Sequence, residues 1–224
     1  MKAERVAPLL FAVLAAIYWL SLWTDGFPGD WAVKAAPMLL AAAVLGQTLP
    51  PRLGLPMAIG FIAAAAGDVF LALDRREYLM QGLLCFLVTQ LAYSTAFLAR
   101  QRPPDDRLEF RLPVAVYGLV VLAMMLPALD AFFWPVTLYV VALITMAVLA
   151  AGFEAGPGRV FAGACVFVVA DSLIGIDRFV VPVPFSEPII VGLYAIGQFL
   201  IFTGMLTVRS GMGGPEGRSW LAND

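Results

Sequence analysis

Histidine is absent from all 224 residues of this chain. Its absence removes the commonest general base and the commonest metal ligand from any mechanism. Cysteine occurs only at Cys85 and Cys165, each within an apolar run, so we expect buried free thiols rather than a disulfide. Without histidine, and with two separated cysteines, a hydrolytic zinc site lacks its usual ligands. We therefore expect no metal and no cofactor.

Charged residues are also scarce. They make up 13% of the chain, which is about half the fraction found in typical soluble domains. Hydrophobic residues make up 62%, and the mean hydropathy is +0.89. Only lipid tolerates so apolar a surface. The net charge of −2 offers no basic face, so we expect no nucleic-acid partner. Composition thus predicts an integral membrane protein.

Apolar runs long enough to cross a bilayer recur along the chain. A transmembrane helix needs roughly 17–25 mostly apolar residues. Eight segments qualify, some of them short: 6–23, 32–49, 54–73, 78–99, 111–127, 131–151, 160–180 and 188–208. The first ends in tryptophans rather than a small-residue cleavage site, so we interpret it as a retained helix and not a signal peptide. We predict an all-α membrane protein with eight transmembrane helices in one domain, residues 1–209, followed by a disordered polar tail, residues 210–224.

The basic residues are divided unevenly between the two sides of such a bundle. With the N-terminus inside, ten lysines and arginines fall at inner loops and ends, and four fall at outer ones. Cytoplasmic loops normally carry the excess of positive charge. We therefore expect a multi-pass protein of a bacterial inner membrane with both termini cytoplasmic. The outer side is then the periplasm, and an organelle lumen is the alternative.

Two aspartates interrupt the apolar spans, and the sequence around them repeats. Residues 66–75 and 169–178 each place a small residue before an aspartate, and an Asp-Arg pair six residues after it. The two aspartates are Asp68 and Asp171. The copies stand four spans apart and so point the same way through the membrane. This predicts two parallel four-helix halves related by a pseudo-two-fold axis along the membrane normal.

An aspartate in the middle of a bilayer is costly, by at least ~2.5–3.5 kcal/mol on insertion scales. Pseudo-symmetry predicts Asp68 and Asp171 at matching depth, slightly outward of mid-membrane and facing each other. Gln90 and Gln198, each central in the helix after its aspartate, would lie nearby. One interpretation is structural, with each protonated aspartate bonded to a glutamine or to Ser172. The interpretation that we favour is a polar cavity in which the two aspartates act on a ligand.

Six short motifs follow one another in a fixed order along the chain. They are Lys34-Ala-Ala-Pro37-Met38, Gly67-Asp68-Val-Phe-Leu71, Gly82-Leu-Leu-Cys-Phe86 with Tyr93 and Phe97 after it, Phe167-Val-Val-Ala-Asp171-Ser172, Phe179-Val-Val-Pro-Val-Pro184, and Tyr194-Ala-Ile-Gly-Gln198. In this order and spacing they resemble the lysoplasmalogenase (YhhN-like) family of eight-span membrane hydrolases. Three positions depart from the family's usual residues, which are often His at Gln90, usually Ser at Ala170 and often Tyr at Ala195.

The resemblance implies an ether hydrolase that cleaves the vinyl ether bond of lysoplasmalogens to a fatty aldehyde and a glycerophospho-ethanolamine or -choline. Its partners would be this lysophospholipid substrate and the lipid bilayer. A vinyl ether is nearly inert to base but hydrolyses once a proton reaches its β-carbon, which creates an oxocarbenium ion. Such a site needs one protonated carboxyl group and one carboxylate. Glycosidases offer an analogy, since they use two carboxyl groups against a similar cation. Asp68 and Asp171 are the candidate catalytic pair, and the sequence does not assign acid and base between them.

Further polar residues are candidates for substrate binding, namely Lys34, Gln90, Tyr93, Ser172, Tyr194 and Gln198. The glutamines and tyrosines would orient water and substrate oxygens, or else bond one helix to another. Lys34, near the outer boundary, would meet the lipid phosphate or serve as a snorkelling anchor.

Other interpretations remain open. Asp74 and Asp177, each beside an arginine, are expected to form helix-end ion pairs. The main alternative function is a proton-coupled small-molecule or lipid transporter, because parallel repeats and midplane acids also occur in carriers. A non-enzymatic lipid-binding or scaffold protein is a third possibility.

Overall fold

The computed structural model describes residues 2–24, 26–101, 107–153 and 158–212. Within these ranges the chain forms eight α-helices, with two short 3₁₀ turns between the fifth and the sixth. The helices are α1 (Lys2–Ser21), α2 (Asp30–Thr48), α3 (Pro51–Leu73), α4 (Leu79–Leu98), α5 (Leu108–Met125), α6 (Phe133–Gly152), α7 (Arg159–Phe179) and α8 (Ser186–Met212). The all-helical prediction is confirmed. The predicted tail begins inside the end of α8, and residues 213–224 lie outside the described residues.

Six of the described helices, α3 to α8, are long and apolar enough to cross a membrane. The apolar part of α1, Val6–Ser21, is shorter. Large aliphatic and aromatic side chains are exposed on the outer faces of the bundle, among them Leu9 at 67%, Leu55 at 62% and Trp134 at 69%. So many exposed apolar side chains need lipid to cover them. The protein is an integral membrane protein.

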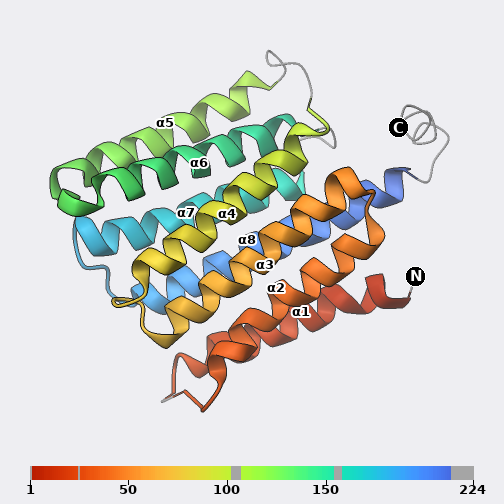
Figure 1. Ribbon diagram of the computed structural model, residues 1–224, viewed down its shortest axis with the longest axis horizontal. Coiled ribbons are helices and arrows are strands. Elements are labelled where there is room, and N and C mark those ends of the chain that lie inside the picture. Colours follow the sequence, from red (N-terminus) through yellow and green to blue (C-terminus); the bar gives the residue numbers. More distant parts are fainter. Residues whose placement is uncertain (1, 25, 102–106, 154–157, 213–224) are drawn as a thin grey trace.

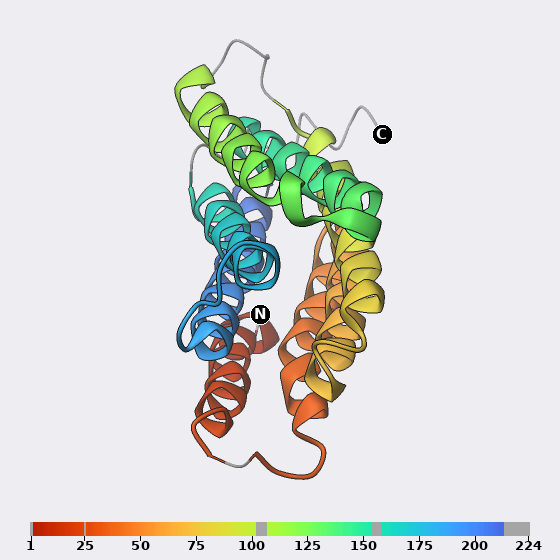
Figure 2. The same ribbon diagram turned by 90° about the vertical axis from the view of Figure 1, so that its left-hand side faces the viewer.

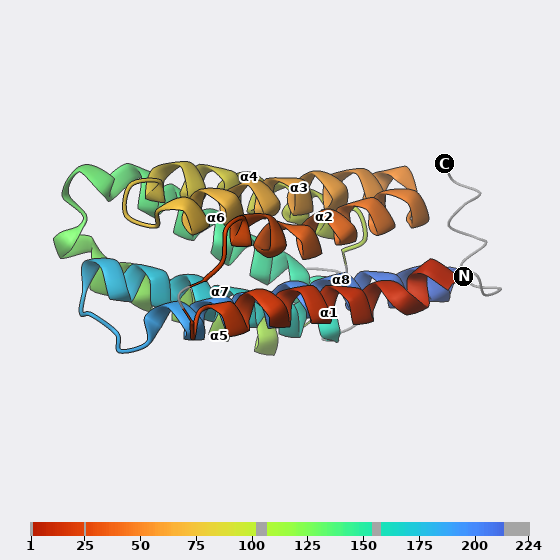
Figure 3. The same ribbon diagram turned by 90° about the horizontal axis from the view of Figure 1, so that it is seen from below.

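The helices lie side by side along the long axis of the molecule (Figure 1). In Figures 2 and 3, α2, α3 and α4 form one layer, and α1, α8 and α7 form the other. Helices α5 and α6 close one edge between these layers, where α6 packs on both α4 and α7. Six helices thus contact one another in a closed ring, in the order α2, α3, α4, α6, α7, α8. Helix α1 packs outside the ring on α2 and α8, and α5 packs outside it on α6 and α7.

Two glycines allow α7 and α8 to pack closely. A Cβ atom at Gly163 would lie 2.6 Å from the carbonyl oxygen of Gly197, and one at Gly197 would lie 3.0 Å from the carbonyl oxygen of Gly163. Such small-residue contacts let helix backbones approach each other in membranes. They hold α8, which carries Tyr194 and Gln198, against the helix that carries Asp171.

The C-terminal ends of α3 and α7 are tied together. Arg75 Nη2 lies 3.7 Å from Asp177 Oδ2, so the predicted ion pair of Asp177 joins the two copies of the repeat. Asp74 instead stabilises the loop after α3, where its Oδ1 accepts the backbone N–H groups of Arg76 at 2.8 Å and Glu77 at 2.9 Å. The N–H groups of Glu77 and Arg76 hold the pKa of the exposed Asp74 carboxyl below its usual value.

Candidate active site

Asp68 and Asp171 line the same small pocket inside the bundle, together with Lys34 and Tyr194. The remaining walls are apolar side chains of α3, α4, α7 and α8. Asp68 is 1% exposed and Asp171 is 9% exposed, so neither carboxyl group meets bulk solvent. The cavity volume is about 30 Å³. Since roughly 10–15 Å³ suffices for one water molecule, the pocket has room for about two.

The Asp68 carboxyl group is held by a tyrosine and faces a cation. The hydroxyl of Tyr194 donates to Asp68 Oδ2 at 2.9 Å. Lys34, which is half-buried, lines the same pocket as Asp68. Its Nζ also lies 5.3 Å from the centroid of the Tyr18 ring, within cation–π distance. Asp68 thus shares its pocket with a hydroxyl donor and a basic side chain.

The glycine before Asp68 has a packing role. A Cβ atom at Gly67 would lie 2.9 Å from the ring of Phe86 on α4. The absence of a side chain lets this ring pack against α3, where it lines the carboxyl pocket. Phe86 also meets the Tyr194 ring edge to face, with centroids 5.6 Å apart. Gly67 thus makes room for the ring that forms the pocket wall beside Asp68.

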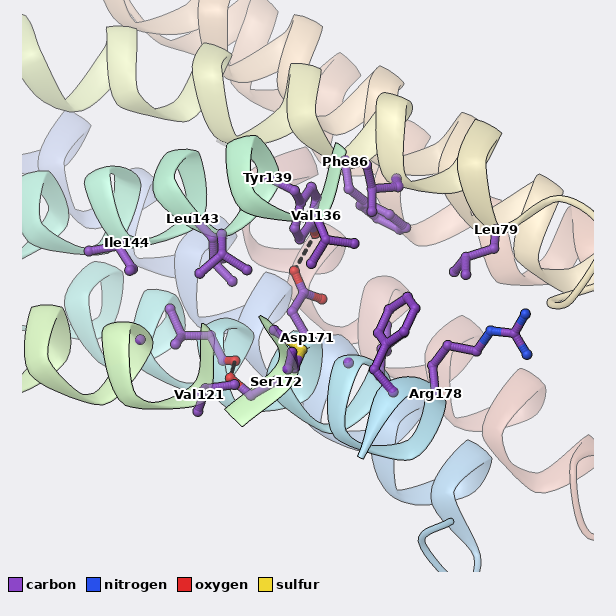
Figure 4. Close-up of a pocket in the computed structure, with 18 of the residues that line it drawn as sticks. Leu79, Phe86, Val121, Val136, Tyr139, Leu143, Ile144, Asp171, Ser172 and Arg178 are labelled. Carbon is purple, nitrogen blue, oxygen red and sulfur yellow. Dashed lines mark hydrogen bonds between the residues drawn. The ribbon is translucent and has the colours of Figure 1, made fainter. Parts of the chain in front are cut away.

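The Asp171 carboxyl group is held by two neutral donors. Its Oδ2 accepts the hydroxyl of Tyr139 on α6, the hydrogen bond drawn in Figure 4. Gln90 Nε2 on α4 lies 3.4 Å from the same oxygen and 3.1 Å from the Tyr139 hydroxyl. Tyr139 therefore donates to the carboxyl group and accepts from the amide. Among the described residues, the buried Gln90 Oε1 has no hydrogen-bond partner and so remains available as an acceptor.

Asp171 also lines a second, largely apolar pocket, between α7 and helices α4, α5 and α6. Its cavity volume is about 60 Å³. Figure 4 shows Asp171 near its middle, with Arg178 toward one end and Leu143 and Ile144 toward the other. Because Asp171 and Phe86 line both pockets, the apolar space begins directly beside the carboxyl pair.

The structure separates the other predicted residues into two groups. Tyr93 and Gln198 bond to each other, from the Tyr93 hydroxyl to Gln198 Oε1 at 2.9 Å, and line neither of these pockets. They link α4 to α8. Ser172 lies in the wall of the apolar pocket, and its hydroxyl donates to the Val168 carbonyl oxygen at 2.7 Å. Of the six residues predicted to bind substrate, Lys34, Gln90 and Tyr194 are therefore those in contact with the carboxyl pocket or its acids.

Sequence reasoning missed Tyr139. Its hydroxyl is one of the two donors to Asp171, yet the residue belongs to none of the six motifs. A signal was present, because Tyr139 stands nearly two turns inside α6. Tyrosines that anchor a helix at the membrane boundary lie at its ends. A tyrosine deeper in an apolar span needs a polar partner within the bundle.

The arrangement offers two carboxyl groups, space for water and an adjoining apolar pocket. Acid–base chemistry on an amphipathic substrate fits these features, since proton transfer requires donors and acceptors within hydrogen-bond reach. Within the described ranges, no three side chains of the Cys, Asp and Glu types gather closely enough to hold a metal ion.

Comparisons with known proteins agree with the motifs. Lysoplasmalogenase TMEM86A of Bos taurus is 29% identical over 218 residues, which covers 90% of this chain and 89% of the relative. Lysoplasmalogenase TMEM86A of Homo sapiens is 27% identical over 223 residues, with coverage of 90% and 89%. No solved structure matches the chain significantly. The sequence profile of the YhhN family matches residues 29–205, a range that contains both aspartates and every residue described in their pocket, and the chain therefore belongs to the YhhN family.

Proposed function

We propose that this protein is a membrane hydrolase that cleaves the vinyl ether bond of lysoplasmalogens. The products are a fatty aldehyde and a glycerophospho-ethanolamine or -choline, and Asp68 and Asp171 form the acid–base pair. The observation that carries this proposal is the presence of both carboxyl groups in one water-sized pocket beside an apolar pocket. The names of the two relatives, both lysoplasmalogenases, support the substrate.

The reaction requires four proton transfers, two from the carboxyl groups and two to them. One carboxyl group gives its proton to the β-carbon of the vinyl ether, and the carbon–carbon double bond becomes an oxocarbenium ion. The other, ionised, takes a proton from water as the water oxygen adds to the α-carbon. The resulting hemiacetal collapses when the second carboxyl group returns a proton to the glycerol oxygen and the first accepts the hydroxyl proton. Aldehyde and alcohol leave, and both carboxyl groups regain their starting forms.

The residues around the two aspartates position the carboxyl groups and bind the substrate. Tyr139 and Gln90 position the Asp171 carboxyl group, and Tyr194 positions that of Asp68. Lys34, on the wall of the carboxyl pocket, adds positive charge that attracts an anionic lipid to the site. Tyr93 and Gln198 support the site by linking α4 to α8. Ser172 lies in the wall of the apolar pocket, where it orients the substrate.

We also propose that all eight helices cross the membrane, in two parallel four-helix halves. The ring of contacts supports this architecture: exchanging α2 with α6, α3 with α7 and α4 with α8 leaves its order unchanged. The excess of basic residues at one end supports cytoplasmic termini in a bacterial inner membrane. Reporter fusions at the two termini test the orientation, and a reporter active only on the outer side would contradict it.

Mass spectrometry of the products tests the function. Purified protein is incubated with an alkenyl lysophospholipid and, separately, with its acyl counterpart. We expect a fatty aldehyde from the alkenyl lipid alone, because only the vinyl ether forms an oxocarbenium ion on protonation. Release of fatty acid from the acyl lipid without aldehyde from the other would refute the proposed reaction. Uptake of solute into proteoliposomes without aldehyde formation would favour the transporter instead.

A further inference from the structure

The apolar pocket extends beyond the carboxyl pair on both sides. Arg178 lies at its outer end, and Gly118, Leu143 and Ile144 line its inner part. We propose that this pocket binds the hydrocarbon chain of the lysophospholipid, with the headgroup toward Arg178 and the chain running inward past Asp171. The substrate class rests on the function proposed above, whereas the binding test below needs no hydrolysis.

The order of groups along α7 matches that of the lipid. Arg178 and Asp171 are seven residues apart, which is about 10.5 Å along the helix axis, and Val168 lies about 4.5 Å further inward. A cation, a carboxyl group and an apolar wall therefore follow one another in this direction. A lysophospholipid presents its phosphate, ether bond and chain in the same order. With the headgroup at the cation, the scissile bond comes beside Asp171.

The inner end of the pocket leads toward lipid. Val168 also lines a groove between α5 and α7, together with Tyr117 and Cys165, whose cavity volume is about 180 Å³. The groove opens on the outer face of the bundle, since Tyr117 is 40% exposed and the neighbouring Val169 is 38% exposed. A hydrocarbon chain too long for the pocket can thus continue past Val168 into this groove. Long lipid chains therefore need no larger cavity.

A second apolar groove provides an internal comparison. It lies between α1 and α8, is lined by Phe11, Trp19 and Phe199 among others, and has a cavity volume of about 510 Å³. Neither aspartate lines it. Size alone would favour this groove for a lipid chain, whereas contact with the carboxyl pair favours the pocket beside Asp171. The two locations give different crosslinking patterns.

Two glycines offer matched variants, one in each location. A Cβ atom at Gly118 would overlap the Ile144 side chain, so Gly118→Ala forces Ile144 to shift within the inner part of the pocket. A Cβ atom at Gly192 would lie 3.1 Å from Trp19 Nε1 in the α1–α8 groove. Both changes replace a helical glycine by alanine and so raise helix propensity equally. They differ in which apolar space they reduce.

The test uses a saturated alkyl-ether lysophospholipid with a photoreactive diazirine at the end of its chain. This probe has no vinyl ether and is not a substrate for the proposed reaction. We expect crosslinks to purified full-length protein at residues 113–118 and 165–169, competed by the unlabelled lipid. Each methylene withdrawn from apolar surface is worth about 0.8 kcal/mol, or about fourfold in affinity. Gly118→Ala, which displaces roughly one or two methylenes, should weaken competed crosslinking about tenfold, while Gly192→Ala leaves it unchanged.

Other crosslinking patterns overturn the proposal. Competed crosslinks on α1 and α8, or the absence of any competed crosslink, would show that the chain does not bind beside Asp171. Adding Ile144→Ala to Gly118→Ala should restore crosslinking by clearing the displaced side chain, and a loss that persists would contradict the assigned location. Competed crosslinks at the expected positions without aldehyde from alkenyl lipid would instead refute the function and leave the chain site intact.

Discussion

Removing the Tyr139 hydroxyl tests how Asp171 is held. Tyr139→Phe deletes one donor to Asp171 Oδ2 but keeps the ring that lines the apolar pocket. A hydrogen bond to a charged group is worth about 1.5–3 kcal/mol. Gln90 Nε2, 3.4 Å from the same oxygen, remains as a donor, so the loss should fall at the lower end of this range. About 1.5 kcal/mol corresponds to roughly a tenfold decrease in kcat.

The assay measures aldehyde release over a range of substrate concentrations. We expect kcat to fall while KM stays within about twofold, because the hydroxyl orients the carboxyl group rather than the lipid. Tyr78→Phe is the matched control, since Tyr78 is the residue just before α4 and lines neither the carboxyl pocket nor the apolar one. A wild-type kcat in Tyr139→Phe, or an equal loss in Tyr78→Phe, would refute the assigned positioning role.

Three further changes test the framework around the site. Gly163→Val should lower the melting temperature and separate α7 from α8, because the valine side chain would meet the Gly197 backbone. Overpacking of this kind costs about 1–3 kcal/mol. A wild-type melting curve would contradict this contact. Arg75→Gln should cost at most about 1 kcal/mol and less at high salt, as expected for a partly exposed ion pair, and chemical unfolding at two salt concentrations measures it. Asp74→Ala should speed hydrogen exchange in the α3–α4 loop at neutral pH. Since the folded pKa of Asp74 is lowered, its stabilising effect is present above the unfolded pKa and lost as pH falls through the folded value, where variant and wild type should converge.

The helices and the acid pair are the features that sequence predicts best. Hydropathy reports the lipid environment directly, so each of the eight apolar segments corresponds to a helix whose ends differ by only a few residues. The two aspartates stand out because charge within an apolar span is costly and therefore rare. Their repeated surroundings point to one shared location, and Asp68 and Asp171 do line one pocket.

The contacts between distant helices are harder to predict, because they depend on how the helices rotate against one another. Tyr139 resembles an ordinary residue of an apolar span until α6 is packed beside α7. Gln198 is central in the helix after Asp171, as Gln90 is in the helix after Asp68, yet Gln198 bonds to Tyr93 while Gln90 reaches Asp171. The rotation of each helix thus decides which amide meets a carboxyl group, and a ten-residue repeat does not encode this rotation.

The central claim is that Asp68 and Asp171 act together as acid and base. Its most direct test is the rate of aldehyde release from alkenyl lysophospholipid by purified Asp68→Asn and Asp171→Asn, each with an unchanged melting temperature. Positioned acid–base groups contribute about 10²–10⁴-fold to such rates. We expect a loss of this size in both variants. Hydrolysis by either correctly folded variant at a rate close to that of the wild type would contradict the paired-carboxyl mechanism.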